Sequence, residues 1–496
     1  MLLNKNMISS LKIDVLRLPS TESFDFPEKV IQFGTGVLLR GLPDYIIHVA
    51  NQQGDFRGRI LVVQSTGSGA VEAFAKQDNL YTLAVNGVEA GTIKDDYILI
   101  NSISRVCAAA TQWQEVLKAA ENPELDVIIS NTTEVGIVAS TDSVDENPPT
   151  SFPGKVCAFL FHRYQYFNGA PNKGMVILPT ELIDNNGSML KKFVLQVAER
   201  SRLPEAFIQW LVMANDFCDT LVDRIVPGKL TASQQIKAES RLGYEDPLMI
   251  MAEPYYLWAI TAKNQRTFDR LSFAKANKSV HLVPSIKKFK EIKLRLLNGT
   301  HTFSCAAAIM AGFVTVKEAM ENTSFNRFVS GLMDEIISCM DDPALEKSEL
   351  KEFANQVIDR FANPFLAHRW ESIALNYTSK MRMRNVPILL KSQVLSNGPL
   401  PSMTLGFAAY LLFMRSHESD GQFIQNAYGS SIVLQDDQAA KLYEYNQQGQ
   451  EGLVKLLADK ELWGSSLMEI PGFAEQVQRD MQAIVQKGFL TAFEEK

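Results

Sequence analysis

The chain of 496 residues has few cysteines, and they do not cluster. Their odd number and the lack of any CxxC pair exclude a thiolate zinc site and a disulfide framework. This usage is typical of a protein from a reducing compartment. The five residues are Cys107, Cys157, Cys218, Cys305 and Cys339. Histidine is also scarce, with six in the chain and none in an HxxxH or HExxH group, so we expect no metal.

The sequence also lacks a positive surplus and a long apolar run. Lys and Arg number 49 against 56 Asp and Glu, a net charge of −7, whereas a nucleic-acid binder needs a basic surplus. The longest apolar run, residues 403–414, is too short for a bilayer, which needs about 20 residues. The N-terminus has no apolar signal-peptide core. We therefore expect a cytoplasmic protein that binds neither nucleic acid nor membrane. The oligomeric state is left open.

The first half of the sequence alternates short β-branched runs with helical stretches. Several of the runs are continuously apolar, which is typical of strands that helices cover on both faces of a doubly wound sheet. The predicted strands are residues 30–33, 60–64, 80–85, 127–130 and 175–178.

From about residue 286 onward, long helical patterns dominate and strand-like segments nearly vanish. The polar stretch 272–285 reads as a linker. The sequence therefore predicts an α/β Rossmann-type N-terminal domain over residues 1–280 and a mainly α-helical C-terminal domain over residues 281–496. The predicted helices of the second part include residues 287–314, 324–340, 348–361, 404–415 and 473–487.

The first predicted strand ends in a glycine-rich turn. A buried strand, a GxG turn and an apolar helix together direct free helix N–H groups at a pyrophosphate. The usual third glycine is replaced by Leu39, so the pattern is GxGxxxRG. A turn that needs glycine for backbone reasons alone is the alternative. The predicted dinucleotide-binding residues here are Phe33, Gly34, Thr35, Gly36 and Val37.

Polar residues at the ends of two further strands are also candidates for the cofactor. Gln64 ends the second strand, where a dinucleotide fold usually has a carboxylate that binds the ribose. Because no carboxylate is present here, the sequence does not decide between NAD and NADP. Asn131, Thr132 and Glu134 follow a later strand. Because ligands bind at the carboxyl ends of parallel strands, we expect these three to face the nicotinamide. A helix cap is the alternative.

The most informative stretch is KEIKLRLLNGTH, residues 290–301. On an α-helix, Lys293, Asn298 and His301 project at roughly 0°, 140° and 80°, within one broad sector. An ammonium that exchanges a proton, an amide that polarises an oxygen and an imidazole that orients the substrate can together act on a carbonyl. The alternative is a solvated lysine, a capping asparagine and a core histidine.

Three separated motifs, in order, resemble the long-chain polyol and mannitol dehydrogenases. They are GxGxxxRG near the start, VDRI at 222–225 and KxxxxNxxH at 293–301. The likeness extends over nearly the whole chain and is closer to the members that act on sugar acids. The longer stretches that support it include IQFGTGVLLRGLPDY (31–45), FNGAPNKGMVILPTELIDNNG (167–187), KLRLLNGTHT (293–302) and SIALNYTSKMRMR (372–384).

The resemblance implies that the N-terminal domain binds NAD(H) and that the reaction needs no metal. It implies that Lys293 is the acid/base, Asn298 an oxyanion donor and His301 a substrate-positioning group. The implied reaction is hydride transfer from NADH to the ketone of a keto-sugar acid. The sequence departs from polyol-specific relatives at Leu182, which stands in place of a second oxyanion donor, and at Lys290, which stands in place of a glutamate.

A sugar-acid substrate has a carboxylate, which favours an arginine fork or a lysine. Among Lys380, Arg382 and Arg384 of the SKMRMR segment, Lys380 and Arg382 are the leading candidates, with a solvated charged face as the alternative. A keto-sugar acid of other stereochemistry or a polyol stays open as the substrate. A protein of another class, a noncatalytic sensor of a sugar acid or dinucleotide, would not need the proton donor Lys293.

Overall fold

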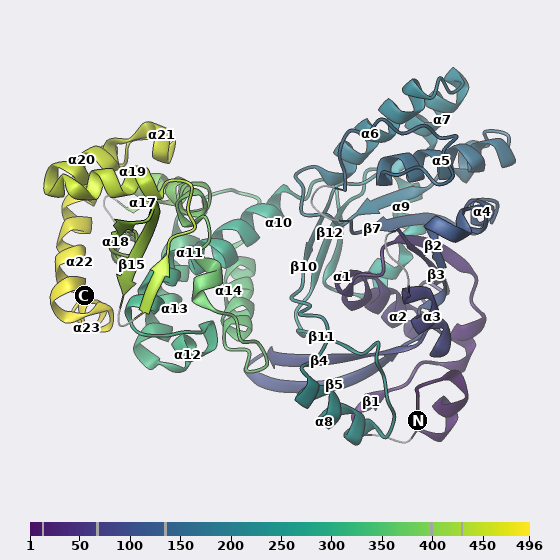
Figure 1. Cartoon of the computed structure of the whole chain (residues 1–496), viewed down its shortest axis with the longest axis horizontal. Helices are drawn as coiled ribbons and strands as arrows, with labels where there is room; N and C mark the ends of the chain where they lie inside the picture. The colour runs from purple at the N-terminus through teal and green to yellow at the C-terminus, as the bar shows by residue number, and fades with distance from the viewer. Residues whose placement is uncertain (12–13, 66–68, 133–135, 397–399, 428–429) are drawn as a thin grey trace. The chain divides into compact units, whose positions relative to one another are not determined.

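The computed structural model describes the chain except residues 12–13, 66–68, 133–135, 397–399 and 428–429. The chain forms two compact units, which can be followed by colour in Figure 1. The first comprises Met1–Asn86 and Ile93–Lys287, and the second comprises Gly87–Thr92 and Lys288–Lys496. The stretch 272–285, predicted as a linker, instead contains the 3-10 helix η4 (Ser272–Ala276) and strand β13 (Val280–Val283) of the first unit.

The first unit is built on a six-stranded sheet in which all neighbouring strands are parallel. Its strand order is β6-β3-β2-β7-β8-β9. The chain enters the sheet at the central strand β2, continues through β3 to β6 at one edge, and then passes through β7 and β8 to β9 at the other edge. This is the doubly wound Rossmann order, and it confirms the predicted fold class. The strands are β2 (Glu28–Phe33), β3 (Arg59–Gln64), β6 (Ile103–Ala108), β7 (Val127–Ser130), β8 (Val176–Pro179) and β9 (Asp216–Phe217).

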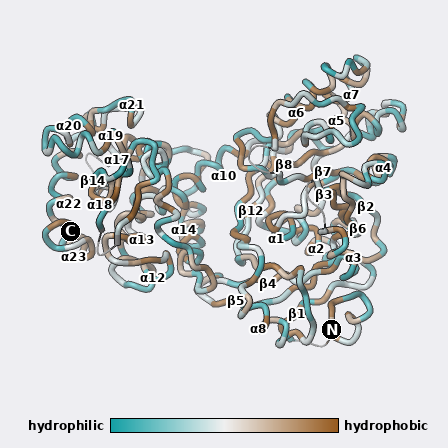
Figure 2. The backbone as a smooth tube through the Cα atoms, viewed as in Figure 1, coloured by the Kyte–Doolittle hydropathy of each residue, from teal (hydrophilic) through white to brown (hydrophobic). Residues whose placement is uncertain are grey.

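Successive side chains of these strands enter two separate hydrophobic cores. Val30 packs with helices α1 and α2 on one face, whereas the next residue, Ile31, packs with helices α4 to α7 on the other. This explains why the strands read as continuous apolar runs, which appear brown in Figure 2. The helices are α1 (Val37–Gly41), α2 (Pro43–Gln53), α3 (Ala70–Lys76), α4 (Ala109–Ala119), α5 (Phe152–Tyr166), α6 (Asn186–Arg200) and α7 (Glu205–Ala214).

The predicted strand 80–85 forms, but in a different sheet. It belongs to β4 (Tyr81–Glu89), whose sheet has the order β1-β5-β4-β11. A third sheet has the order β10-β12-β13. An apolar run shows that a strand is buried but does not specify its neighbours, which depend on tertiary contacts. The additional strands are β1 (Leu16–Arg17), β5 (Thr92–Ile100), β10 (Thr220–Asp223), β11 (Ile250–Ala252) and β12 (Leu257–Thr261).

The second unit is mainly helical, as predicted, with one small sheet. Strands β14 (His417–Ser419), β15 (Gln422–Ala427) and β16 (Ser430–Val433) form an antiparallel meander that the sequence analysis missed. No helix in the described part of the chain is long and apolar enough to cross a membrane. The longer helices are α11 (Thr300–Met310), α13 (Thr323–Ser338), α14 (Lys347–Phe361), α17 (Val386–Ser396), α18 (Pro401–Phe413), α20 (Gly449–Ala458) and α22 (Phe473–Lys487).

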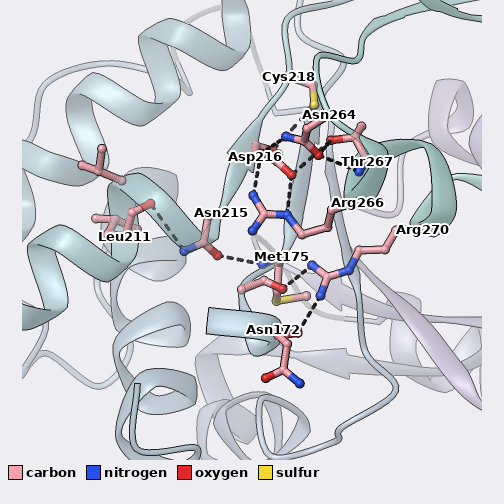
Figure 3. A network of polar contacts seen from close by, with 12 residues as sticks. Asn172, Met175, Leu211, Asn215, Asp216, Cys218, Asn264, Arg266, Thr267 and Arg270 are labelled. Carbon is pink, nitrogen blue, oxygen red and sulfur yellow. Dashed lines mark hydrogen bonds and ion pairs between the residues drawn. The ribbon is translucent and has the colours of Figure 1, made fainter. Parts of the chain in front are cut away.

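A polar network fixes the short edge strand β9 of the Rossmann sheet (Figure 3). The Asp216 carboxylate accepts hydrogen bonds from Asn264 Nδ2 at 2.9 Å, Arg266 Nε at 2.7 Å and Thr267 Oγ1 at 3.0 Å. Burial alone would raise the pKa of Asp216, but these donors outweigh it and lower the pKa below the ordinary value. Nearby, Asn215 Oδ1 accepts from the backbone N–H of Met175 at 2.8 Å. These contacts compensate for the few ladder bonds of a two-residue strand.

A buried histidine makes the stability of the first unit dependent on pH. His48 of α2 contacts Asn101 Oδ1 through its Nδ1 atom at 3.2 Å, and Asn101 Nδ2 donates to Ser23 Oγ at 2.7 Å. Burial lowers the pKa of His48 to about 4. The unfolded chain binds the proton from about pH 6.5 downward, so acidification in this range favours unfolding.

We predict that this histidine removes about 2 kcal/mol of the free energy of unfolding between pH 7 and pH 5. His48→Gln, which cannot titrate, should lack this part of the pH dependence. Denaturant titrations of both proteins at the two pH values measure it. An equal pH dependence in both would contradict the buried, neutral state of His48.

Candidate active site

The two glycines of the turn after β2 differ in their surroundings. Gly34 has close neighbours, whereas Gly36 has free space around it. Gly34 has φ +129°, and a Cβ there would lie 2.8 Å from Leu39 Cδ1. Its N–H donates to Val63 O at 2.9 Å, which joins the turn to β3. A Cβ on Gly36, the N-cap residue of α1, would meet no protein atom within 4 Å. The turn therefore requires Gly34 for its own geometry, whereas Gly36 leaves the backbone accessible to a ligand.

Two buried arginines hold the helix that follows the turn. Arg224 of the VDRI motif donates through Nη1 to Gly41 O at 2.5 Å and through Nε to Glu253 O at 2.9 Å. Arg40 donates through Nη1 to Leu248 O at 2.7 Å. These contacts give both arginines of the sequence motifs a structural role, because their partners are backbone carbonyls.

The polar residues at the carboxyl ends of β7 and β8 bind one another. Asn131 Nδ2 donates to Thr180 O and Oγ1, both at 3.0 Å. The Thr132 backbone N–H and hydroxyl donate to Glu181 Oε1 at 2.8 Å and 3.0 Å. Glu181 is buried. The sequence did not indicate its role, because a residue that follows β8 cannot be matched from sequence to its partner Thr132, which follows β7. Glu134 lies outside the described residues.

The remaining predicted cofactor residues differ in their surroundings. Phe33 is fully buried and packs edge-on against Phe152 with ring centroids 5.4 Å apart. Gln64 is buried at the end of β3. Thr35 and Val37 are half-buried beside the exposed Gly36.

The first unit therefore fits a dinucleotide. Central strand β2 leads into a turn whose second glycine leaves room at the start of α1, and polar residues end the neighbouring strand β7. The residues that would hold the dinucleotide are Gly34, Thr35, Gly36 and Val37, with Asn131 and Thr132 at the adjacent strand end.

In the second unit, the predicted catalytic segment is a π-helix, which corrects the α-helical expectation. Helix α10 (Lys287–Ile292) continues into the π-helix η5 (Lys293–Gly299), and α11 follows. A π-helix has hydrogen bonds between residues i and i+5 and therefore more residues per turn than an α-helix. The angle between the Lys293 and Asn298 side chains around the helix axis is therefore smaller than the 140° of an α-helix. Lys293 and Asn298 are both half-buried. The Asn298 side-chain amide makes no hydrogen bond to any described residue, so its donors are available to a ligand.

His301, at the start of α11, is held among aromatic rings. It stacks on Phe361 with centroids 4.0 Å apart and planes 5° apart, and it meets His368 and Trp370 edge-on. Burial, followed by interactions with His368 and Arg360, lowers the pKa of His301 well below its ordinary value. The imidazole is therefore neutral at physiological pH. Its Nε2 atom is enclosed and has no hydrogen-bond partner among the described residues.

A second π-helix, η6 (Met381–Asn385), packs against η5 and is fastened to it by two side chains. The Arg295 guanidinium donates through Nη1 to Met383 O at 2.9 Å and Arg384 O at 2.5 Å. In return, Asn385 Nδ2 donates to Gly299 O at 3.3 Å. We call these contacts the π-helix clasp. A Cβ on Gly299 would lie 2.9 Å from Asn385 Oδ1, so a larger residue there would require the Asn385 side chain to shift.

The predicted substrate-binding residues differ in exposure. Lys380 is half-buried, and its Nζ donates to Ile373 O at 3.0 Å. Arg382 is exposed and donates to Glu461 O at 3.2 Å. Burial, followed by the positive charge of Arg384, lowers the pKa of Lys380.

Comparisons with known proteins agree with this division of the chain. Residues 28–271 match the mannitol dehydrogenase Rossmann domain, and residues 285–485 match the mannitol dehydrogenase C-terminal domain. The chain belongs to the mannitol dehydrogenase family. Altronate oxidoreductase of Bacillus subtilis (strain 168) is 38% identical over 95% of each chain. Altronate oxidoreductase of Escherichia coli O7:K1 is 39% identical over 94% of this chain and 96% of its own.

Solved structures of more distant proteins have the same fold. Pseudomonas fluorescens mannitol 2-dehydrogenase, in a ternary complex with NAD and D-mannitol, has a TM-score of 0.67 at 20% identity and covers 100% of this chain and 99% of its own. D-sorbitol dehydrogenase in substrate-free form has a TM-score of 0.77 at 19% identity, covering 99% of this chain and 100% of its own. The Rossmann unit and the helical unit are thus both features of the family fold.

The different environments of the two glycines lead to separable effects. Gly36→Asp puts a favoured N-cap residue where a Cβ meets no protein atom, so stability should hold. Its carboxylate would repel a pyrophosphate, and we predict at least about a tenfold weaker affinity for NADH, or 1.4 kcal/mol. NADH fluorescence titration measures the affinity.

Gly34→Ala is the matched control, because it strains the turn itself. Its positive φ and the approach to Leu39 should lower the free energy of unfolding by about 1–3 kcal/mol. Wild-type NADH affinity in Gly36→Asp would exclude this turn as the pyrophosphate site.

Proposed function

We propose that the chain catalyses the reversible, NADH-dependent reduction of D-tagaturonate to D-altronate in hexuronate catabolism. Its family makes it an NAD-dependent oxidoreductase that acts on a CH–OH group. The observation that most supports the sugar-acid substrate is the likeness to altronate oxidoreductases, at 38% and 39% identity over both units.

The second unit contains the groups that the reaction needs. NADH, when bound, supplies a hydride to the ketone carbon. Lys293 Nζ donates a proton to the ketone oxygen as its negative charge develops, and the two additions convert C=O to CH–OH. The free amide of Asn298 donates a hydrogen bond to the same oxygen. In this proposal His301, whose Nε2 atom has no hydrogen-bond partner among the described residues, positions the substrate.

In this assignment the first unit holds the cofactor through the turn at Gly34 and Gly36. Asn131 and Thr132 are placed by their bonds to Thr180 and Glu181, which keep the ends of β7 and β8 together. A rigid edge at this point supports a fixed orientation of the nicotinamide. Leu182, 66% exposed beside Glu181, offers an apolar surface where polyol-specific relatives have a donor.

The substrate is tested by following NADH absorbance with tagaturonate, fructuronate and fructose, and NAD reduction with altronate and mannitol. We predict turnover of tagaturonate and altronate, with fructuronate, fructose and mannitol lower by at least about 100-fold in kcat/KM. Reduction takes up a proton and oxidation releases one, so the two directions should have different pH optima.

Comparable turnover of mannitol or fructuronate would refute the substrate assignment. Absence of turnover with every compound, despite NADH binding, would favour a sensor. Lys293→Ala is the internal control of the chemical step, expected to lose at least about 100-fold in kcat while the NADH dissociation constant stays unchanged.

A further inference from the structure

Arg384 lies in η6 with one donor left for a ligand. Its Nη1 atom donates to Thr302 Oγ1 at 3.1 Å, and its own carbonyl is held by Arg295 Nη1 at 2.5 Å. The Nε atom is enclosed without a partner among the described residues. The Nη2 atom makes no hydrogen bond to any described residue and is not enclosed. The side chain is thus anchored on one side and has a free donor on the other.

The charge around Arg384 is mainly positive. Burial lowers the pKa of Arg384, and none of the described carboxylates forms an ion pair with it. Lys380 and Arg360 add positive charge close enough, with Arg384 itself, to act on His301. A partly buried guanidinium without a counterion costs free energy, and natural proteins usually pair such a group. An anionic ligand would supply the missing counterion.

We infer that Arg384 binds the carboxylate of the sugar-acid substrate through its Nη2 donor. The inference rests on the proposed function and extends it to the residue that distinguishes an acid from a neutral sugar. Thr302, which fixes the guanidinium, directly follows His301 and also donates to Asn298 O at 2.8 Å. Thr302 therefore connects the Arg384 guanidinium to the short segment that contains Asn298 and His301.

The structure favours Arg384 over Arg382, the leading arginine from the sequence. Arg382 is exposed, so the charge it presents to a ligand is weakened by water and salt. Arg384 is half-buried, and its backbone is fixed by the π-helix clasp. A preorganised, partly desolvated guanidinium gives a stronger charge-assisted hydrogen bond to a carboxylate.

The test compares tagaturonate with tagatose, its neutral counterpart, in wild type, Arg384→Gln, Arg384→Lys and Arg382→Gln. We expect Arg384→Gln to lower kcat/KM for tagaturonate by about 10- to 100-fold and to change kcat/KM for tagatose less than about threefold. Arg384→Lys should restore part of the loss, because it keeps the charge but not the fork. Arg369→Gln, which removes an exposed arginine paired with Glu371, controls for net charge.

Each outcome decides a separate point. Equal losses for both substrates in Arg384→Gln, or a carboxylate-selective loss only in Arg382→Gln, would overturn the inference. A raised NADH dissociation constant in Arg384→Gln would instead assign this anion site to a cofactor phosphate. If wild type reduces other keto sugars but not tagaturonate, the proposed function fails independently of any Arg384 result.

Discussion

The arrangement of the proposed catalytic unit depends on the π-helix clasp. A π-helix is uncommon because its wide turn is less well packed, so two in contact need additional support. Arg295 provides it by donating to two carbonyls of η6 while its Nε atom binds Glu291 at 2.8 Å on the preceding turn. Lys293 and Asn298 lie in η5. Arg384 lies in η6, and Lys380 directly precedes η6. One buried guanidinium therefore fixes both the proposed proton donor and the proposed carboxylate anchor.

The two units differ in the polar groups that they make available to a ligand. The Rossmann unit leaves its backbone accessible to an anion at Gly36 and immobilises nearby strand ends through Glu181. The helical unit concentrates positive charge around a neutral imidazole and leaves several donors without partners among its described residues. Donors without a partner destabilise a fold when they are buried, which is consistent with a ligand that satisfies them. The net charge of −7 gives no hint of this local positive field.

Sequence periodicity identified the Rossmann class, the helical second half and helix α22 with its observed ends, because each depends on local patterning. It did not place β4 in a separate sheet or find β6, since strand neighbours depend on distant contacts. It gave Lys293, Asn298 and His301 an α-helical spacing, because residue i+5 hydrogen bonding has no apolar signature. It ranked Arg382 above Arg384 because exposure cannot be read from an alternating SKMRMR segment. The resemblance named the family, and its dinucleotide, catalytic and substrate roles stay predictions.

Arg295 positions the proposed catalytic segment, and the variant Arg295→Lys tests this role. Lysine keeps the charge opposite Glu291 but cannot span the carbonyls of Met383 and Arg384 as the guanidinium fork does. Stopped-flow measurement of altronate oxidation, with NADH affinity determined in parallel, distinguishes an effect on catalysis from an effect on cofactor binding. We expect a kcat at least about tenfold lower than that of the wild type, with an unchanged NADH dissociation constant. A wild-type kcat in a stably folded Arg295→Lys protein would contradict it.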